Sequence, residues 1–289
     1  MTDTQFEPAK EVSGKNFRPL IIASTEILMK SRHRIFISLI FALGLIGPAS
    51  AERRSILVKS GEKIAFLGDS ITAGGARKNG YVTLTMEALN HEGLKLTHIP
   101  AGKSGNRSKD MLARLDASII SKDPDWMVLS CGVNDVWHFT LTLGKRTFQG
   151  IPLEDYEKNI REILKQAKAA DIKVVILTST MIGEDPERET NKKLIPYNEF
   201  LRKVAKEKNL PLVDLSKDMH AALENIPDEK GKARMFGEPK YGRNIKNKLT
   251  TDGCHMNLLG NIMMAKGVLR GFGLSEEKIA AAEKRWIGE

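Results

Sequence analysis

The sequence predicts an α/β protein in which helices cover both faces of a five-stranded parallel sheet. From residue 62 onward, short apolar runs alternate with longer amphipathic stretches, a pattern typical of repeated βαβ units. Polar clusters directly follow the first three apolar runs, and ligands of parallel sheets bind beyond the carboxyl ends of the strands. The 289 residues are 41% hydrophobic and 28% charged, which suits one large globular domain or two small ones.

Each expected element follows from its pattern of apolar residues. The strand candidates are short apolar runs at 63–67, 94–99, 126–130, 173–178 and 210–215. Apolar residues spaced by three or four positions predict helices over 81–91, 109–120, 153–169, 191–208, 258–270 and 276–285. Residues 139–151 and 226–249 interrupt this alternation. We expect them to be loop insertions that form walls of a pocket.

The N-terminal part has the composition of a targeting segment. Residues 29–51 begin at a methionine and combine three basic residues with an apolar run of about a dozen residues and the small-x-small sequence Ala49-Ser50-Ala51. This pattern predicts a signal peptide cleaved after Ala51, and hence a secreted or periplasmic protein without stable membrane insertion after cleavage. Residues 1–28 are then a mis-called start or a disordered extension, and 52–289 form the domain. The alternative is a short membrane anchor.

The stretch FLGDSIT at 66–72 places Ser70 at the mouth of the first strand. A serine there either caps a helix or is a nucleophile that requires a base. Of the six histidines, only His255 lies in a loop with a carboxylate at close spacing, Asp252 in TDGCHMN. Asp252 is placed to orient His255 toward Ser70. The alternative is that Asp252 caps a turn and His255 is a surface residue.

A nucleophilic serine also needs donors for an oxyanion. The candidates are the Asn134 side chain in GVND, the backbone N–H of Gly105 in KSGNRS and the N–H of Ser70. Each of these residues alone is explained as simply by a turn or a loop. The intact set nevertheless argues against a non-catalytic carbohydrate-binding module, because such a module has no need of a serine paired with a base.

Taken together and in order, GDSIT, SGN, GVND and DxxH resemble the motifs of the SGNH hydrolase superfamily, also called the GDSL esterases, over residues 62–272. The resemblance implies a flavodoxin-like, three-layer αβα sandwich and ester hydrolysis without metal or cofactor. It implies Ser70 as nucleophile, Asp252 and His255 as acid and base, and Ser70, Gly105 and Asn134 as oxyanion donors. Pro100 stands where the family often has an asparagine, which implies a stiffer turn.

Cys131 and Cys254 are the only two cysteines. In the family fold, the loops that carry them meet around the serine. We therefore expect their Cα atoms to be near enough for a disulfide, and the alternative is two buried free thiols.

The substrate is predicted less directly. The predicted export and the absence of a long apolar lid favour a short acyl group, acetyl above all, on a carbohydrate. A lysophospholipase or lipase is the alternative. Trp137 and His138 are candidates for a sugar-facing wall, and the alternative for Trp137 is a packing residue. Residues 230–248 contain seven Lys or Arg against one Glu. This favours a solvated basic loop and no nucleic-acid partner, although Lys240, Arg243 and Lys246 also suit an anionic glycan. The oligomeric state stays open.

Overall fold

A five-stranded parallel sheet forms the centre of the computed structural model, which describes residues 56–238 and 242–288. Its strand order is β2-β1-β3-β6-β7. This is the flavodoxin-like order, so the predicted fold class is confirmed. The strands are β1 (Lys63–Gly68), β2 (Thr97–Gly102), β3 (Trp126–Ser130), β6 (Lys173–Leu177) and β7 (Leu212–Val213).

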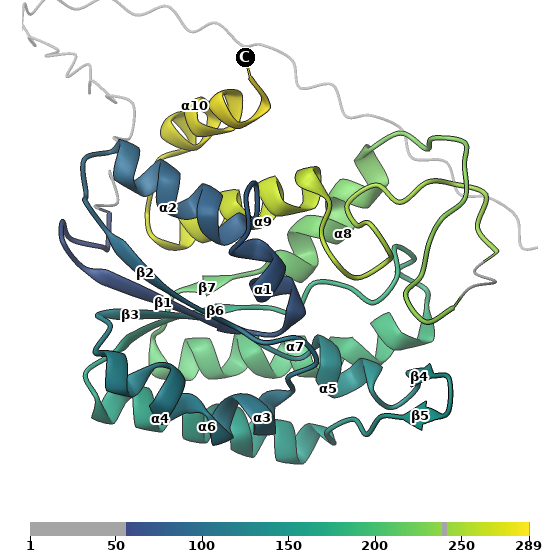
Figure 1. The fold of residues 1–289 in the computed structure, drawn as a ribbon, viewed down its shortest axis with the longest axis horizontal. Coiled ribbons are helices and arrows are strands. Elements are labelled where there is room, and N and C mark those ends of the chain that lie inside the picture. The colour runs from purple at the N-terminus through teal and green to yellow at the C-terminus, as the bar shows by residue number, and fades with distance from the viewer. Residues whose placement is uncertain (1–55, 239–241, 289) are drawn as a thin grey trace, which may run out of the picture. The chain divides into compact units, whose positions relative to one another are not determined.

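Helices cover both faces of the sheet (Figure 1). One layer contains α2 (Tyr81–His91), α8 (Leu215–Asn225), α9 (Leu258–Gly271) and α10 (Glu276–Ile287). The opposite layer contains α3 (Ser108–Ala113), α4 (Leu115–Ser118), α6 (Leu153–Ala169) and α7 (Glu189–Lys208). The described residues therefore form three layers, helix, sheet and helix, as the resemblance implied.

The core follows from the apolar patterns of these elements. All five residues of β3 are buried, as expected for a central strand covered on both faces. Along α6 the apolar positions recur every three or four residues, which places them on one side of the helix. The buried residues of α6 are Tyr156, Ile160, Ile163, Leu164 and Ala167.

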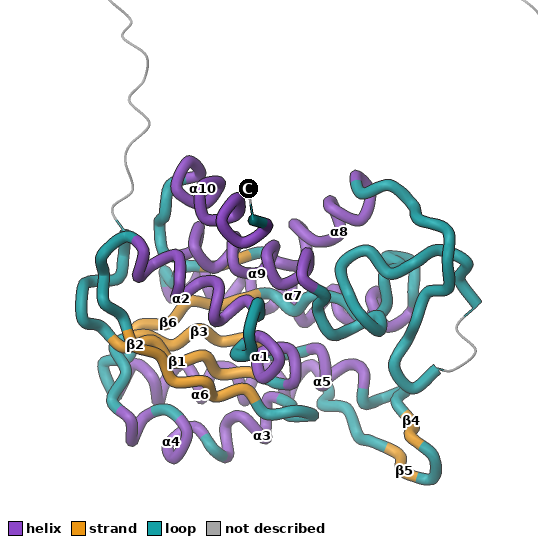
Figure 2. Tube along the Cα trace, turned by 45° about the horizontal axis from the view of Figure 1, so that its top comes forward, coloured by secondary structure: helices purple, strands orange, loops and turns teal. Residues whose placement is uncertain are grey.

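Two short helices lie at the carboxyl ends of the central strands. Helix α1 (Ser70–Gly75) follows β1, and α5 (Val133–Trp137) follows β3. Because β1 and β3 are parallel neighbours, both helices begin at the same edge of the sheet (Figure 2). In the sheet, β1 lies between β2 on one side and β3 on the other, so the direction in which successive strands are added reverses at β1. This edge is thus the switch point at which open α/β sheets bind ligands.

The second strand begins later than predicted. The expected strand 94–99 is found at Thr97–Gly102, because the Asn90 side chain bonds both backbone groups of Leu96 and closes a turn there. The strand also runs through Pro100, which pairs with Phe66. Proline is tolerated because β2 is an edge strand, on which one row of N–H groups needs no partner.

Other expected elements differ in length or continuity. The predicted helix 109–120 is divided into α3, α4 and a 3₁₀ turn, Ile120–Lys122, with Arg114 as the break. The fifth strand is only Leu212–Val213, because Asp214 caps α8, a helix that the sequence pattern did not predict. The insertion 139–151 contains a small antiparallel hairpin of β4 (Thr142–Leu143) and β5 (Arg146–Thr147).

The predicted segments 1–28 and 29–51 and the first residues of the predicted domain lie outside the described residues. In the part of the chain that the structure describes, none of the helices combines the length and apolar character needed to cross a membrane.

Candidate active site

Ser70 is the first residue of α1, directly beyond the end of β1. The preceding residue, Asp69, caps this helix by accepting a hydrogen bond from the Ile71 N–H at 2.8 Å. Gly68 is required at the strand end because an added Cβ would lie 2.0 Å from Thr72 Oγ1. The tight passage from strand to helix leaves Ser70 partly exposed at the sheet edge.

His255 lies between Ser70 and Asp252. Its Nε2 is 2.8 Å from Ser70 Oγ, and its Nδ1 is 2.8 Å from Asp252 Oδ2. Asp252 Oδ1 also accepts a hydrogen bond from the His255 backbone N–H at 2.8 Å. The structure therefore brings these three predicted residues, which come from opposite ends of the described chain, into one hydrogen-bonded row.

The charges in this row stabilise one another. The hydrogen bond to Asp252 raises the pKa of His255, although burial opposes the shift. Burial alone would raise the pKa of Asp252, but hydrogen bonds from the His255 side chain and backbone outweigh it and lower that pKa. Asp252 is thus held as a carboxylate that favours the imidazolium form of His255.

The predicted oxyanion donors lie beside the same strand ends. Asn134, the second residue of α5, is buried, and its Nδ2 donates a hydrogen bond to the backbone oxygen of Asn106 at 3.1 Å. An amide nitrogen has two hydrogens, so this bond orients the group and leaves the second hydrogen available. Gly105 adopts φ +77°, which favours glycine. As the first residue of α1, Ser70 also has a backbone N–H without a partner inside its helix.

Arg114 joins these parts and was not foreseen from the sequence. Its guanidinium donates to the carbonyl oxygens of Gly68 at 3.0 Å and Ala101 at 2.8 Å, and to Asn106 Oδ1 at 2.6 Å. It thereby connects the ends of β1 and β2 to the residue that orients Asn134. The sequence held one sign of this role: Arg114 is a charged residue between Met111 and Leu115, two apolar residues of a predicted helix that are both buried.

The buried carboxyl of Asp135 is a second group that holds the helix of Asn134 in place. The neighbouring Asp135 accepts hydrogen bonds from the backbone N–H and the hydroxyl of Ser108, and burial raises the pKa of its carboxyl to about 6. Burial also raises the pKa of Asp69 to about 6. These carboxyls tie α3, α5 and the start of α1 to the sheet edge.

The exposed aromatic ring beside His255 belongs to Phe236 and not to Trp137. Trp137 and His138 are both buried, so they do not form a sugar-facing wall, and Trp137 is a packing residue as the alternative had it. Trp137 instead packs edge-on against Phe236 at 5.7 Å between ring centroids. Phe236 is 41% exposed, and its ring centroid is 5.9 Å from that of His255. The insertion 226–249 therefore supplies the exposed ring beside the histidine.

Cys131 and Cys254 are both buried free thiols, so the second of the two expected arrangements is found. Burial raises the pKa of both thiols well above the ordinary value. A protonated, buried thiol is a poor nucleophile. Neither cysteine therefore competes with Ser70 for that role.

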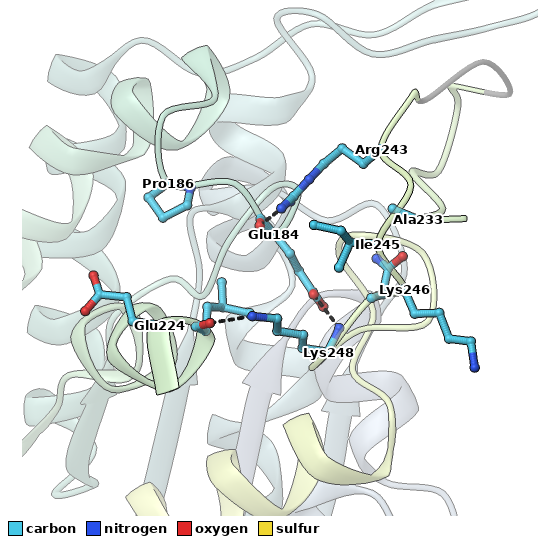
Figure 3. A pocket seen from close by; sticks show the side chains of 10 residues that line it. Glu184, Pro186, Glu224, Ala233, Arg243, Ile245, Lys246 and Lys248 are labelled. Carbon is cyan, nitrogen blue, oxygen red and sulfur yellow. Dashed lines mark hydrogen bonds between the residues drawn. The ribbon is translucent and has the colours of Figure 1, made fainter. Parts of the chain in front are cut away.

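A cavity of about 130 Å³ lies between residues 243–248 on one side and Glu184 and Glu224 on the other (Figure 3). Ser70 and His255 are not among its lining residues. The buried carboxylate of Glu184 borders it and accepts hydrogen bonds from the chain at 248–250. No local sequence pattern indicated this contact. Among residues 56–238 and 242–288, no three His, Cys, Asp or Glu side chains are grouped to hold a metal ion.

Comparison with protein families gives a match over most of this region. The model of the GDSL-like lipase/acylhydrolase family matches residues 66–261. An acetylxylan esterase from Geobacillus stearothermophilus is 27% identical over 234 residues, which are 75% of this chain and 96% of that protein. Thioesterase 1/protease 1/lysophospholipase L1 from Escherichia coli (strain K12) is 26% identical over 152 residues, 53% of this chain and 65% of that protein.

Solved structures show the same similarity. The crystal structure of the acetyl xylan esterase AlAXEase has a TM-score of 0.60 and 32% identity, and the match covers 72% of this chain and 98% of that one. An acetylxylan esterase structure from Geobacillus stearothermophilus has a TM-score of 0.63 at 24% identity, with 76% and 97% covered. At that identity the second match supports the fold alone.

Proposed function

The chain belongs to the GDSL-like lipase/acylhydrolase family and is a carboxylic ester hydrolase, and from this premise we propose an exported serine esterase that removes acetyl groups from carbohydrate. The observation that carries the proposal is the row Ser70–His255–Asp252, with both side-chain hydrogen bonds at 2.8 Å. A serine hydroxyl becomes a strong nucleophile only when a base takes its proton, and His255 Nε2 is within reach to do so.

The first step is acylation of Ser70. His255 Nε2 takes the hydroxyl proton while Ser70 Oγ bonds to the ester carbonyl carbon. The His255 Nδ1–H donates to Asp252, whose negative charge stabilises the imidazolium that forms. His255 then gives the proton to the leaving alcohol, and the C–O bond to that alcohol breaks. Water completes the cycle: its oxygen bonds to the acyl carbon while His255 takes its proton, the bond from that carbon to Ser70 Oγ breaks, and His255 returns the proton to Oγ as the acid leaves.

Three donors are assigned to the oxyanion of the tetrahedral intermediate. They are the free hydrogen of Asn134 Nδ2 and the backbone N–H groups of Gly105 and Ser70. Asn134 is already oriented by Asn106, so little reorganisation is needed when the negative charge forms.

Three observations support a small acyl group on a sugar. Two relatives that match about three quarters of this chain are named acetylxylan esterases. The exposed ring of Phe236 beside His255 offers an apolar platform of the kind a sugar face packs against. Among the described residues of 226–249, Phe236 is the one large apolar side chain more than a third exposed, which is unlike the lid that a long acyl chain would require.

A lysophospholipase or lipase is the second candidate, favoured by the similarity to the Escherichia coli enzyme. The earlier proposal of an anionic glycan is less well supported. Arg243 donates to the backbone oxygen of Glu184 and Lys246 pairs with Glu229, so both cations already have partners, and Lys240 lies outside the described residues.

Export rests on the signal-peptide pattern of residues 29–51. N-terminal sequencing of the protein recovered outside the cytoplasm tests it. We expect the chain to begin at Glu52, whereas a chain that retains residues 29–51 would contradict cleavage.

The esterase proposal is tested with p-nitrophenyl esters from acetate to palmitate, with Ser70→Ala as the control. We expect the highest kcat/KM on acetate and a loss of at least about 10⁴-fold in the variant. Preference for long chains would favour the lipid candidate. Equal activity of both proteins would contradict Ser70 as the nucleophile.

A further inference from the structure

Glu184 lies in the loop between β6 and α7, far in sequence from the residues that it contacts. Its side chain is 7% exposed. Oε1 accepts hydrogen bonds from the backbone N–H groups of Leu249 at 2.8 Å and Thr250 at 2.6 Å, and Oε2 accepts one from the N–H of Lys248. One carboxylate thus satisfies three successive backbone donors, of which the bond from Lys248 is drawn in Figure 3.

The contact continues from these residues into the loop of Asp252 and His255. The Thr250 hydroxyl donates to Glu184 Oε1 at 2.7 Å and accepts from the N–H of Gly253 at 2.9 Å. Gly253 is the residue directly after Asp252. Its carbonyl oxygen accepts a hydrogen bond from the N–H of Gly183 at 2.6 Å. Residues 183–184 therefore hold the peptide next to Asp252 from two sides.

We propose that Glu184 is a positioning residue, whose buried carboxylate holds the 248–253 chain so that Asp252 and His255 stay aligned with Ser70. The proposal rests on the proposed function for its effect on turnover. The loop has other hydrogen bonds, among them the Phe236 N–H to the Asp252 backbone oxygen and the Thr251 N–H to the His255 backbone oxygen, both at 2.8 Å, but Glu184 connects it to the segment that follows β6.

The physical reason for a carboxylate is that all four partners are donors. An ionised carboxylate only accepts hydrogen bonds, with room for about four. Glutamine has almost the same shape, but its NH₂ group would face at least one of these N–H groups. A buried donor would then lose its acceptor, and the chain would shift. A displacement of about 1 Å at reacting groups costs on the order of 10²-fold in rate.

The cavity provides a matched control. Glu224 lines the same cavity as Glu184, but its carboxylate points away from Glu184 in Figure 3. Glu224 is exposed, and among the described residues its carboxylate accepts no hydrogen bond. Arg243, which also lines the cavity, donates to the backbone oxygen of Glu184. Substitution of the Glu184 side chain leaves that acceptor in place.

The experiment compares the full chain with Glu184→Gln and Glu224→Gln. The readouts are kcat and KM on p-nitrophenyl acetate, the pH profile of kcat/KM, and the downfield proton resonance of His255 Nδ1–H. For Glu184→Gln we expect kcat to fall by about 10²-fold with KM within about twofold. The acid limb of the kcat/KM profile should move to lower pH in Glu184→Gln, because a weaker hydrogen bond to Asp252 lowers the pKa of His255. Glu224→Gln should match the unchanged chain.

A second pair of variants covers the case in which Glu184→Gln does not fold. Thr250→Ser keeps the hydroxyl between Glu184 and Gly253 and should retain activity and the resonance, whereas Thr250→Ala should lose both in part. Unchanged kcat, pH profile and resonance in folded Glu184→Gln, or equal behaviour of the two Thr250 variants, would overturn the proposal.

The resonance also separates the two proposals. If the unchanged chain shows no Ser70-dependent esterase activity, the proposed function fails. The resonance then still tests Glu184: its loss in Glu184→Gln but not in Glu224→Gln supports the positioning role, and its retention in both contradicts it.

Discussion

The two sides of the candidate active site are built differently. Ser70, Gly105 and Asn134 lie just beyond the ends of β1, β2 and β3, so the register of the sheet itself positions them. Asp252 and His255 lie on a loop after the long insertion 226–249, and no sheet strand leads into it. The serine side thus inherits its geometry from the core, whereas the histidine side depends on contacts between loops.

The supports of the two sides differ accordingly. Arg114 and Asp135 fasten the serine side by bonds among elements that already pack together. Glu184 fastens the histidine side across 64 to 66 positions of sequence. We therefore expect damage to the serine-side supports to reduce stability above all, and damage to Glu184 to reduce activity above all.

After the loss of Ser70 itself, the largest effect should come from Asn134→Ala, which removes a proposed oxyanion donor from the serine side. By analogy with other oxyanion donors, the barrier should rise by about 3–4 kcal/mol, a loss of about 10²–10³-fold in kcat with little change in KM. Steady-state kinetics on p-nitrophenyl acetate measure this. A variant with full kcat would remove Asn134 from the oxyanion hole.

An intermediate effect is expected on the histidine side, in the pH dependence of kcat/KM. The bond to Asp252 raises the pKa of His255, and the negative charge of Asp69 acts in the same direction. Only neutral His255 can act as the base, so kcat/KM should rise with pH, with a midpoint above the ordinary value of about 6.5. Asp252→Asn should move this limb to lower pH, since burial is then opposed only by the more distant charge of Asp69. A limb below pH 6 in the unchanged chain would contradict the assigned pairing.

The smallest effect on rate should follow Arg114→Gln, which weakens the support of the serine side. Three acceptors lose a charged donor, so the free energy of unfolding should fall by about 1–3 kcal/mol. We expect kcat to fall less than about tenfold, because the sheet still places Ser70 and Asn134. Denaturant unfolding and kcat together test this. A larger loss of kcat than in Glu184→Gln would reverse the proposed difference between the two sides.

Much of this arrangement was predictable because its signals are local. Alternation of apolar runs was enough for the parallel sheet, and the helix at 81–91 and the strand at 126–130 have their predicted bounds. Prediction was poorest where a distant group decides the local structure. Arg114 breaks an otherwise helical pattern because its guanidinium reaches two strand ends, and Asp214 ends β7 by capping α8. The choice between Trp137 and Phe236 as the exposed ring also depended on packing between segments far apart in the chain.

The sequence by itself determined the fold class, the family resemblance and the candidate roles of Ser70, Gly105, Asn134, Asp252 and His255, because hydrophobic periodicity and short motifs are properties of neighbouring residues. Only the tertiary structure decided that Ser70 and His255, 185 positions apart, lie within hydrogen-bonding distance, that the two thiols stay free, and that Glu184 supports the histidine loop. Such contacts depend on where the folded core places each loop, and a buried carboxylate shows its role only when the donors that it satisfies are in view.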